Sequence, residues 1–419
     1  MKISIVAVGS RGDVQPYVAL GLGLKRAGHH VQIIADPEFQ DFTLDRNLDF
    51  ATISANTRKI FKEDITRFGK NVIGFAKWFK QHNEQIARQN FYELLDAIGT
   101  VDAIIYSPLA PAAFHMAEFK QVPAIGAFLQ PLTPTRYFGP TNLSPLQDWV
   151  PFKGKLNWLR YRWNNKIYFY MLKDILNECR QEVLGLPPLP WRRYANADID
   201  RNRILYGFSN HVVPTPPDWH EDIKVTGYWF LNSENWQPPD DLVNFIDSGP
   251  PPVYVGFGSM IDPKICMLTN IVVRALSEAG QRGILATGWN EKTPGDLPEN
   301  IFPLSEAPHD WLFPRMSAVV HHGGAGTTAA GLRAGMPGLV IPFAFDQPFW
   351  GAKLEQLGTG PRPIPRKQLT VDNLAESIRL MTNSQAYRDN AGKIARKIAE
   401  EEGVSRAVKN IEKWLSVNT

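Results

Sequence analysis

The sequence has little cysteine and no excess of charge of either sign. Its 419 residues include only two cysteines, Cys179 and Cys266. A disulfide framework and a four-cysteine metal site are therefore both excluded, and we expect a reducing compartment. The 45 Lys and Arg residues against 42 Asp and Glu leave a formal net charge of +3. That balance excludes a globally basic nucleic-acid-binding protein, and we expect no nucleic-acid partner.

Long hydrophobic runs are also absent. The longest apolar stretch, around 335–345, is interrupted by Pro337, Gly338 and Pro342. No stretch approaches the roughly 20 apolar residues that a membrane-spanning helix needs. The run at 3–8 is too short for the core of a signal peptide. We therefore expect a cytoplasmic protein, with peripheral contact at the inner face of a membrane still open to it.

Both halves of the chain contain short β-branched runs that alternate with amphipathic stretches. Buried strands that alternate with helices predict parallel sheets with right-handed crossovers. We therefore predict an α/β protein with two doubly wound, Rossmann-like domains that face each other across a cleft. The predicted strands are 3–8, 31–35, 103–106, 122–128 and 204–208 in the first half, and 253–257, 283–286, 318–321 and 339–342 in the second.

Composition divides the chain into four parts. We predict an N-terminal domain at 1–235, a polar and proline-rich linker at 236–252, and a C-terminal domain at 253–388. A helical tail at 389–419 is predicted to pack back on the N-terminal domain. Residues 133–191 are rich in Pro, Trp and Tyr, and we expect them to form an insertion over the open edge of the first domain.

The strongest motif is a glycine-rich turn that follows the predicted strand at 318–321. Its small residues allow backbone N–H groups to approach an anion closely, and the helix that follows adds partial positive charge. The ordinary alternative is a tight turn with a threonine N-cap. Neighbouring residues of a strand point to opposite faces, so we expect one of the two histidines to meet the ligand. The candidate anion-binding residues are His321, His322, Gly324, Ala325, Gly326 and Thr327.

Other loops of the second domain lie at the same predicted edge. Asp346 and Gln347 offer acceptors and donors that suit vicinal hydroxyl groups, and the aromatic residues around them offer a face for stacking on a sugar. The alternative is a polar loop capped by proline. Ser259 follows the first strand of this domain, where its hydroxyl would reach a phosphate. The segment 304–311, with Ala307 and His309, is placed to pair with the edge of a base.

In the first domain, the loop at 9–16 joins the first strand to the first helix. It lacks the third glycine of the dinucleotide fingerprint and the Lys-Ser/Thr of a P-loop. Asp13 has two open interpretations, as the N-cap of the helix or as a general base in the cleft. Arg11 is also expected to point into this cleft.

Four motifs together resemble one enzyme family. They are GSRGDVQP at 9–16, PHDWLFP at 308–314, HHGGAGTT at 321–328 and FDQPFW at 345–350. Their order and spacing resemble the GT-B fold glycosyltransferases that use nucleotide sugars. The resemblance is nearest to the branch of glycosyltransferase family 1 that contains sterol 3-beta-glucosyltransferases and antibiotic-aglycone glycosyltransferases. It covers nearly the whole chain except the middle of the first domain.

The resemblance implies an inverting transfer of glucose from UDP-glucose to a hydroxyl group of a hydrophobic acceptor. A sterol or similar lipid alcohol is the implied acceptor, with a polyketide, polyphenol or other natural-product aglycone as the alternative. No metal and no cofactor are implied, because backbone amides, a histidine and a helix dipole are suited to neutralising the leaving diphosphate.

The resemblance also assigns roles to residues of both domains. Asp13 is implied to be the base that deprotonates the acceptor, with Ser10 and Arg11 beside the donor phosphates or sugar. Ala307 and His309 are implied to contact the uridine, and Asp346 and Gln347 the sugar. The implied pyrophosphate contacts are His321, His322, Ala325, Gly326 and Thr327.

Two other functions remain open at this stage. A nicotinamide-dependent dehydrogenase is suggested by Asp36 at the end of the second strand, although the incomplete glycine pattern of the first loop opposes it. A catalytically silent lipid- or sugar-binding relative is the second, and the presence of Asp13, Asp346 and Gln347 opposes it.

The segment 149–173 predicts a membrane contact. It contains no acidic residue, and Trp and Tyr beside basic residues are typical of a membrane interface. The alternative is a helical hairpin that lines the acceptor cleft with its charges in water. The basic residues are Lys153, Lys155, Arg160, Arg162, Lys166 and Lys173, and the aromatic ones are Trp149, Phe152, Trp158, Tyr161, Trp163, Tyr168, Phe169 and Tyr170.

Overall fold

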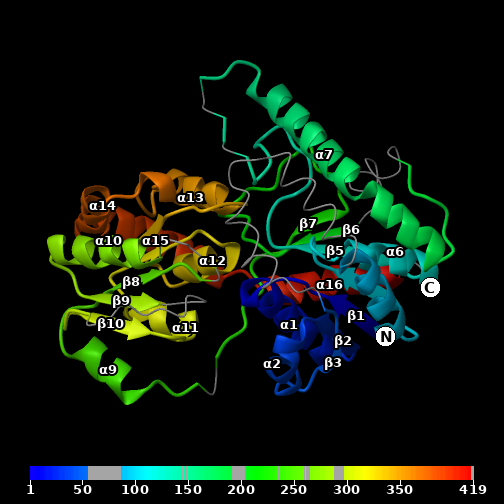
Figure 1. The fold of residues 1–419 in the computed structure, drawn as a ribbon, viewed down its shortest axis with the longest axis horizontal. Helices are drawn as coiled ribbons and strands as arrows, with labels where there is room; N and C mark the ends of the chain where they lie inside the picture. Colours follow the sequence, from blue (N-terminus) through cyan, green and yellow to red (C-terminus); the bar gives the residue numbers. More distant parts are fainter. Residues whose placement is uncertain are drawn as a thin grey trace.

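The computed structural model contains two parallel sheets with helices packed on both faces of each (Figure 1). It describes residues 1–54, 86–143, 145–146, 149–190, 203–233, 236–258, 260, 265–286 and 297–416. Within these residues the first sheet belongs to the N-terminal half of the chain and the second to the C-terminal half. The predicted architecture of two doubly wound domains is confirmed.

The first sheet has seven parallel strands among the described residues. Its central strands are nearly continuous apolar runs, as expected for strands that are buried on both faces. In spatial order the strands are β3 (Asp49–Thr52), β2 (His30–Ala35), β1 (Lys2–Val6), β4 (Ala103–Tyr106), β5 (Ala124–Phe128), β6 (Arg203–Tyr206) and β7 (Ile223–Val225). Ile3 of β1 is in register with Val31 of β2 and Ala103 of β4.

The second sheet has five parallel strands in the described part of the chain. In spatial order they are β10 (Ile301–Leu304), β9 (Gly283–Ala286), β8 (Val253–Gly256), β11 (Ala318–His321) and β12 (Gly338–Val340). The edge strands β3, β7 and β10 were not among the strands predicted from apolar runs. Their residues alternate between polar and apolar or are only partly buried, so no β-branched run marks them.

Helices cover the four sheet faces. On the first sheet, α1 (Arg11–Arg26) packs on one face, and α6 (Pro111–Lys120) packs on the other. Besides the helical segment 86–97, the other helices with bounds in the described residues are α2 (Gln40–Leu44), α7 (Lys153–Glu182), α9 (Asp240–Asp247), α10 (Ile265–Glu278), α11 (His309–Leu312), α12 (Ala325–Arg333), α13 (Gln347–Gln356), α14 (Val371–Asn383), α15 (Gln385–Ala399) and α16 (Gly403–Ser416).

The chain crosses between the two sheets at two places. Trp229 lies in the core under the first sheet, whereas the Ser233 amide donates to Asp310 of the second domain. The second crossing is near residue 400, because α15 packs on α12 whereas α16 packs on α1. The predicted tail at 389–419 is therefore divided between the two domains.

The predicted linker at 236–252 contains helix α9. Leu242 and Ile246 of α9 are buried in a cluster with Tyr254 of β8, so these residues belong to the second domain. The proline and acidic residues that suggested a linker are instead the start of this helix, with Pro239 as its N-cap and Asp240 in its first turn.

Residues 153–182 form one helix of 30 residues, α7, where an insertion at the sheet edge or a helical hairpin was predicted. Helix α7 lies in the crossover between β5 and β6, which are neighbouring strands inside the sheet and not at its edge. Its C-terminal half packs beside α6, where the buried Arg180 donates to Glu118 over 2.9 Å. Its N-terminal half projects away from the sheet (Figure 1).

Candidate active site

The loop between β1 and α1 places a carboxylate at the start of a helix. Ser10 is the N-cap of α1, and Asp13 occupies the third helical position. The Asp13 carboxylate accepts the Ser10 amide over 2.8 Å and the Ser10 hydroxyl over 2.9 Å. Asp13 is thus a capping-box partner and not the N-cap itself. Gly9 has a φ of +139°, and a Cβ there would lie 2.5 Å from the Asp13 carboxylate, so glycine is required at this turn.

The surroundings of Asp13 favour proton uptake. Burial raises the pKa of Asp13, and the two hydrogen bonds from Ser10 partly oppose that rise. A carboxylate with a raised pKa is a stronger base than an exposed one, and at neutral pH it is poised to accept a proton from a hydroxyl group.

The glycine-rich turn places the two histidines in different roles. His321 ends β11, is buried, and accepts the Gly323 amide at its Nδ1 over 3.1 Å. The His322 ring instead lies between two glycines. A Cβ on Gly258 would lie 2.9 Å from its Cε1, and a Cβ on Gly324 would lie 2.6 Å from its Nε2. The Nδ1 of His322 is buried and has no hydrogen-bond partner among the described residues. The predicted division between the two histidines therefore selects His322 as the one available to a ligand.

Helix α12 begins directly after this turn. Gly324 is its N-cap, and Ala325, Gly326 and Thr327 are its first three residues, so no threonine serves as N-cap. The backbone N–H groups of these positions have no acceptor within the helix. Together with the helix dipole they form a site suited to an anion.

His309 and His322, which border the cleft, are both neutral at physiological pH. Burial, followed by the charge of Arg11, lowers the pKa of His309 to about 4. Burial, followed by the charge of His309, lowers the pKa of His322 to about 4. A neutral imidazole keeps one N–H donor and one acceptor nitrogen. His309 is also stacked on Phe313 with ring centroids 4.3 Å apart, which fixes its orientation.

The N-termini of α1 and α12, which follow the 9–16 loop and the glycine-rich turn, meet across the domain interface. A Cβ on Gly326 would lie only 3.8 Å from the Gly12 carbonyl oxygen, so the N-termini of α12 and α1 are in contact distance. Arg11 of the first domain forms an ion pair with Glu306 of the second. Both partners are largely exposed, so we expect this pair to orient the domains more than to stabilise them. Ala307 adjoins Glu306, in the loop that leads into α11.

Asp346 and Gln347 lie at the start of α13 but have different partners. The Asp346 carboxylate accepts the indole N–H of Trp350 over 2.7 Å. The Gln347 side chain is buried, and its Oε1 accepts the amides of Phe343 and Ala344 over 2.7 and 3.1 Å. Gln347 thus closes the turn before α13, while a contact between Gln347 and a sugar stays a prediction.

The two carboxylates of the cleft are electrostatically coupled. Burial raises the pKa of Asp346 to about 6, the Trp350 bond opposes the rise, and the negative charge of Asp13 adds to it. Asp13 and Asp346 are therefore close enough to interact, although they belong to different domains. The structure brings together Ser10, Arg11, Asp13, His309, His322, Gly326 and Asp346.

Some predictions concerning the site are outside this geometry. Ser259 lies outside the described residues. Of the aromatic residues expected to stack on a sugar, Trp350 is fully buried and Phe349 nearly so, whereas Phe345 is exposed. Asp36 precedes a short 3-10 helix at Pro37–Phe39. Within the described ranges, no group of three or more His, Cys, Asp and Glu side chains is arranged to hold a metal ion.

Two partners at the site were not predicted from the sequence. Trp350 lies four residues after Asp346, a spacing that places both side chains on one helix face, and this was a usable signal. Glu306 carries no comparable signal, because its partner Arg11 is almost 300 positions away in the chain and in the other domain.

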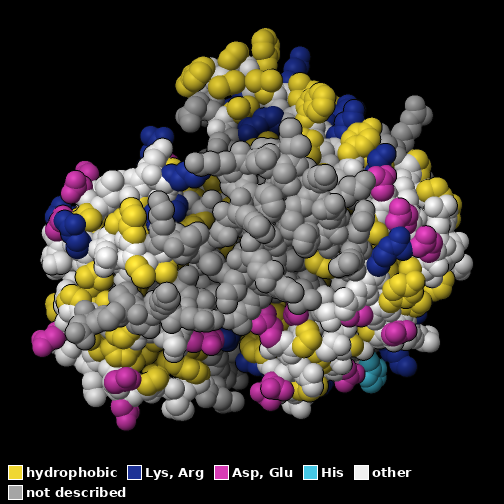
Figure 2. All heavy atoms as spheres, viewed as in Figure 1, with side chains coloured by type: hydrophobic (Ala, Val, Ile, Leu, Met, Phe, Trp, Pro, Cys, Tyr) yellow, Lys and Arg dark blue, Asp and Glu magenta, His cyan; other side chains and the backbone are white. Residues whose placement is uncertain are grey.

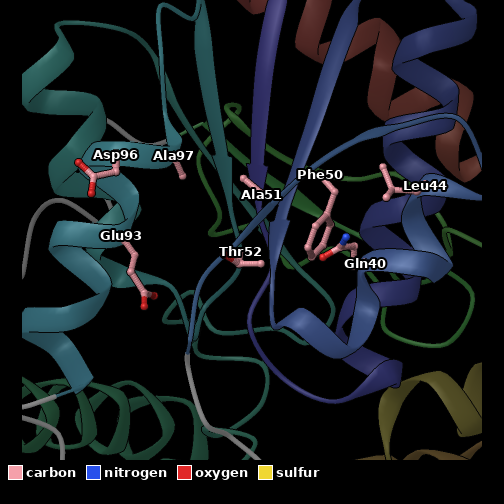
Figure 3. A pocket seen from close by; sticks show the side chains of 8 residues that line it. All are labelled: Gln40, Leu44, Phe50, Ala51, Thr52, Glu93, Asp96 and Ala97. Carbon is pink, nitrogen blue, oxygen red and sulfur yellow. The ribbon is translucent and has the colours of Figure 1, made fainter.

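A separate pocket of about 520 Å³ lies at the β3 edge of the first sheet (Figure 3). Phe50, Ala51 and Thr52 of β3 line it, together with Gln40 of α2 and Glu93 of the helical segment 86–97. Its lining includes no residue of the predicted site, so we do not assign the pocket a role in the chemistry.

Two protein families match parts of the chain. The glycosyltransferase family 28 N-terminal domain matches residues 3–138, and the erythromycin biosynthesis protein CIII-like C-terminal domain matches residues 282–413. A sterol 3-beta-glucosyltransferase of Arabidopsis thaliana is 36% identical over 97% of this chain and 67% of its own length. A sterol 3-beta-glucosyltransferase of Saccharomyces cerevisiae is 34% identical over 98% of this chain but only 35% of its own length. The chain thus spans about two thirds of the plant relative and about a third of the yeast one.

Solved glycosyltransferase structures share the fold. A glycotransferase of kitacinnamycin aligns with a TM-score of 0.72 and 19% identity, covering 98% of both chains. The calicheamicin glycosyltransferase CalG4 aligns with a TM-score of 0.70 and 17% identity, covering 99% of this chain and 98% of that one. The GT-B fold predicted from the sequence is confirmed.

Proposed function

This chain belongs to the sterol 3-beta-glucosyltransferase family, and from that premise we propose that it transfers glucose from UDP-glucose to the hydroxyl group of a sterol or similar lipid alcohol. The names of the relatives support the sugar and the acceptor class. Because the chain belongs to this family, the first loop is not interpreted as part of a nicotinamide-dependent dehydrogenase.

The observation that carries the proposal is the meeting of two helix N-termini. Asp13 lies on the α1 side. On the α12 side lie the first amides of that helix and the Nδ1 of His322, which has no partner among the described residues. Inverting transfer needs a base on one side of the anomeric carbon and a stabilised leaving group on the other. The two domains supply one each.

The proposed reaction follows from this arrangement. Asp13 accepts the proton of the acceptor hydroxyl as its oxygen bonds to the anomeric carbon of glucose. The bond from that carbon to the UDP oxygen breaks with inversion, and its electron pair leaves with UDP. The α12 amides and His322 stabilise the diphosphate by hydrogen bonds. We propose that this set of donors suffices without a metal.

The names of the relatives support the sterol acceptor, and the aromatic rings near the end of β6 do not bear on it, because they pack against one another. Tyr206 is fully buried and stacked on Trp219 at 4.9 Å, and Phe138 contacts the nearly buried Phe349 of the second domain at 5.8 Å. A natural-product aglycone is the alternative, because residues 282–413 match the C-terminal domain of erythromycin biosynthesis protein CIII-like proteins. The solved structural neighbours, at 17–19% identity, support the fold alone.

Acceptor profiling tests the proposal. UDP-glucose is incubated with a sterol, a polyphenol and a polyketide aglycone, and products are identified by mass spectrometry, with and without EDTA. We expect a sterol glucoside of inverted anomeric configuration at the same rate in EDTA. A glucoside formed only from the polyphenol or polyketide would support the alternative, and no product from any acceptor would refute both.

The glycine at the N-cap of α12 offers a first prediction. Gly324→Ala is expected to weaken UDP affinity about tenfold or more, because the new Cβ displaces His322 and costs a hydrogen bond to a charged ligand. Gly324 has φ −63° and ψ 145°, which alanine tolerates, so the fold is retained. Isothermal titration calorimetry with UDP measures the effect.

Gly331→Ala is the matched control for Gly324→Ala. It adds the same methyl group inside the same helix, but nothing lies within 4 Å of the added Cβ. We expect unchanged UDP affinity and slightly higher thermal stability, because alanine favours a helix over glycine by about 1 kcal/mol. Equal UDP affinity in the two variants would remove His322 and the α12 N-terminus from the diphosphate site.

We also propose that α7 docks the protein on anionic membranes. Six large apolar side chains recur along its N-terminal part at intervals of three and four residues, so they lie on one helix face. All are exposed, with Phe152, Trp163 and Ile167 at 76%, 63% and 57%. The stripe consists of Phe152, Leu156, Leu159, Trp163, Ile167 and Tyr170.

Basic side chains flank this stripe on both sides. Figure 2 shows hydrophobic and basic side chains together along the top edge of the molecule, where α7 lies. Several cations rest beside rings of the stripe, such as Lys166 at 5.6 Å from the Trp163 centroid. The opposite helix face is occupied by the fold, because the Tyr161 hydroxyl donates to the Gly139 carbonyl. An apolar stripe with flanking cations suits an interfacial helix. No described helix is long and apolar enough to span a bilayer.

Vesicle co-sedimentation tests this docking. At low salt we expect binding to phosphatidylserine-containing vesicles and not to neutral ones, with about 1 kcal/mol contributed by each basic residue near the surface. Trp163→Ser with Ile167→Ser should abolish binding. The control changes Met267 and Leu380 to serine, since both are exposed apolar residues on other helices. Wild type that stays in the supernatant, or equal binding by both double variants, would refute the docking role.

A further inference from the structure

The indole N–H of Trp350 is directed at a carboxylate of the cleft. Its Nε1 donates to Asp346 Oδ2 over 2.7 Å, from one helical turn further along α13. Trp350 is fully buried, so it cannot itself stack on a sugar. It has therefore a role other than the one predicted for the aromatic residues of this loop.

The position of Trp350 is set by both domains. Its ring meets Phe208, which follows β6 of the first domain, with centroids 6.4 Å apart and planes at 67°. It also meets Phe349 of its own helix at 5.3 Å. A ring that is packed from two sides has little rotational freedom, so the N–H direction is fixed.

We propose that Trp350 is a positioning residue for the sugar-binding step: its indole N–H anchors one carboxylate oxygen of Asp346 and thereby orients that group for the hydroxyls of the donor sugar. This inference rests on the proposed function, because it assumes that Asp346 accepts hydroxyl groups of UDP-glucose. Trp350 acts through Asp346 and does not touch the substrate.

The charges around Asp346 give this role a measurable signature. The charged group that acts on Asp346 from another element is Asp13 of α1. Its negative charge raises the pKa of Asp346, and burial raises it as well. The Trp350 donor has the opposite effect and favours the ionised form. Without it, the pKa of Asp346 is expected to rise by about one unit, because hydrogen bonds to a charged form stabilise that form.

The experiment compares pH profiles of donor use. For Trp350→Phe the acid limb of kcat/KM for UDP-glucose should move up by about one pH unit. At pH 6 the activity should fall about fivefold relative to wild type, and at pH 8.5 the two should nearly agree, since the limb reports ionisation of the Asp13–Asp346 pair. Calorimetry should find a loss of UDP-glucose affinity at pH 6 and nearly none at pH 8.5, with UDP affinity unchanged at both pH values.

Trp229→Phe is the matched control. Trp229 is another buried tryptophan, and its Nε1 donates over 2.9 Å to the neutral hydroxyl of Thr226. This variant loses a comparable hydrogen bond without a carboxylate partner, so its acid limb should stay where wild type has it. Adding Trp350→Phe to Asp346→Asn should also leave the limb of the single Asn variant unchanged.

If Trp350→Phe does not fold, 3-benzothienylalanine at position 350 keeps the ring shape and lacks only the N–H. An acid limb that coincides with wild type in either replacement would overturn the positioning role. Failure of the proposed function itself would look different, because wild type would then neither bind UDP-glucose nor form a glucoside.

Discussion

Replacing Asp13 with asparagine is expected to reduce glucosyl transfer by roughly 10²–10⁴-fold, which is the contribution of a general base. The asparagine oxygen still accepts the Ser10 amide and hydroxyl, so the start of α1 should persist. UDP affinity should remain near wild type, since the diphosphate contacts lie on α12. Steady-state rates and UDP calorimetry on the same preparation separate the two effects.

Asp372→Asn is the control for a change in helix capping alone. Asp372 occupies the first turn of α14, and its replacement changes the same kind of helix-end charge on a helix that carries none of the predicted site residues. We expect unchanged turnover and at most a small loss of stability. Near-normal turnover in a folded Asp13→Asn protein would reduce Asp13 to a capping residue.

Replacing Asp346 with alanine should weaken UDP-glucose affinity about 10–100-fold and leave UDP affinity unchanged, because a hydrogen bond from a sugar hydroxyl to a charged acceptor is lost. The diphosphate site on α12 does not include this side chain. Calorimetric titration with UDP and with UDP-glucose gives the two constants directly. Equal weakening for both ligands would place Asp346 at the nucleotide and not at the sugar.

The alanine variant also leaves the Trp350 donor buried without a partner, which costs about 1–3 kcal/mol of stability. Asp346→Asn avoids this, because its amide oxygen still accepts from Trp350. The pKa of Asp346 is about 6 in the fold against an ordinary value of 3.8, so the folded protein binds this proton more tightly than the unfolded chain. The carboxylate therefore lowers stability increasingly as pH rises from 3.8 to about 6. We expect Asp346→Asn to unfold at a higher temperature than wild type at pH 7, as thermal denaturation would measure.

The alternation of strands and helices, and the sheet edge at which the site lies, could be predicted from the amino-acid sequence. Runs such as those of β1 and β11 are short, rich in β-branched residues and buried almost throughout, a local pattern typical of a strand covered on both faces. Since parallel strands share one carboxyl edge, the loops at 9–16, 321–328 and 345–350 were placed at one cleft before any contact was known. The combination of those motifs also indicated the family.

Which atom of each motif is available to a ligand depends on packing. Alternation along β11 required that His321 and His322 differ. Only packing shows that His321 accepts the Gly323 amide, whereas the Nδ1 of His322 has no partner in the described part of the chain. Adjacency made Asp346 and Gln347 look like a pair, yet the Gln347 oxygen closes the preceding turn. Each outcome depends on backbone groups whose positions local sequence does not encode.

Contacts between the domains were beyond the sequence for the same reason. Asp13 and Asp346 influence each other, and Phe208 confines Trp350, across more than 100 intervening residues. The packing of α16 on α1 and the extent of the long helix α7 also depend on surfaces formed elsewhere in the chain. Periodicity encodes which face of an element is apolar, whereas the partner of that face, and the charge state of a group buried there, arise only when distant elements pack together.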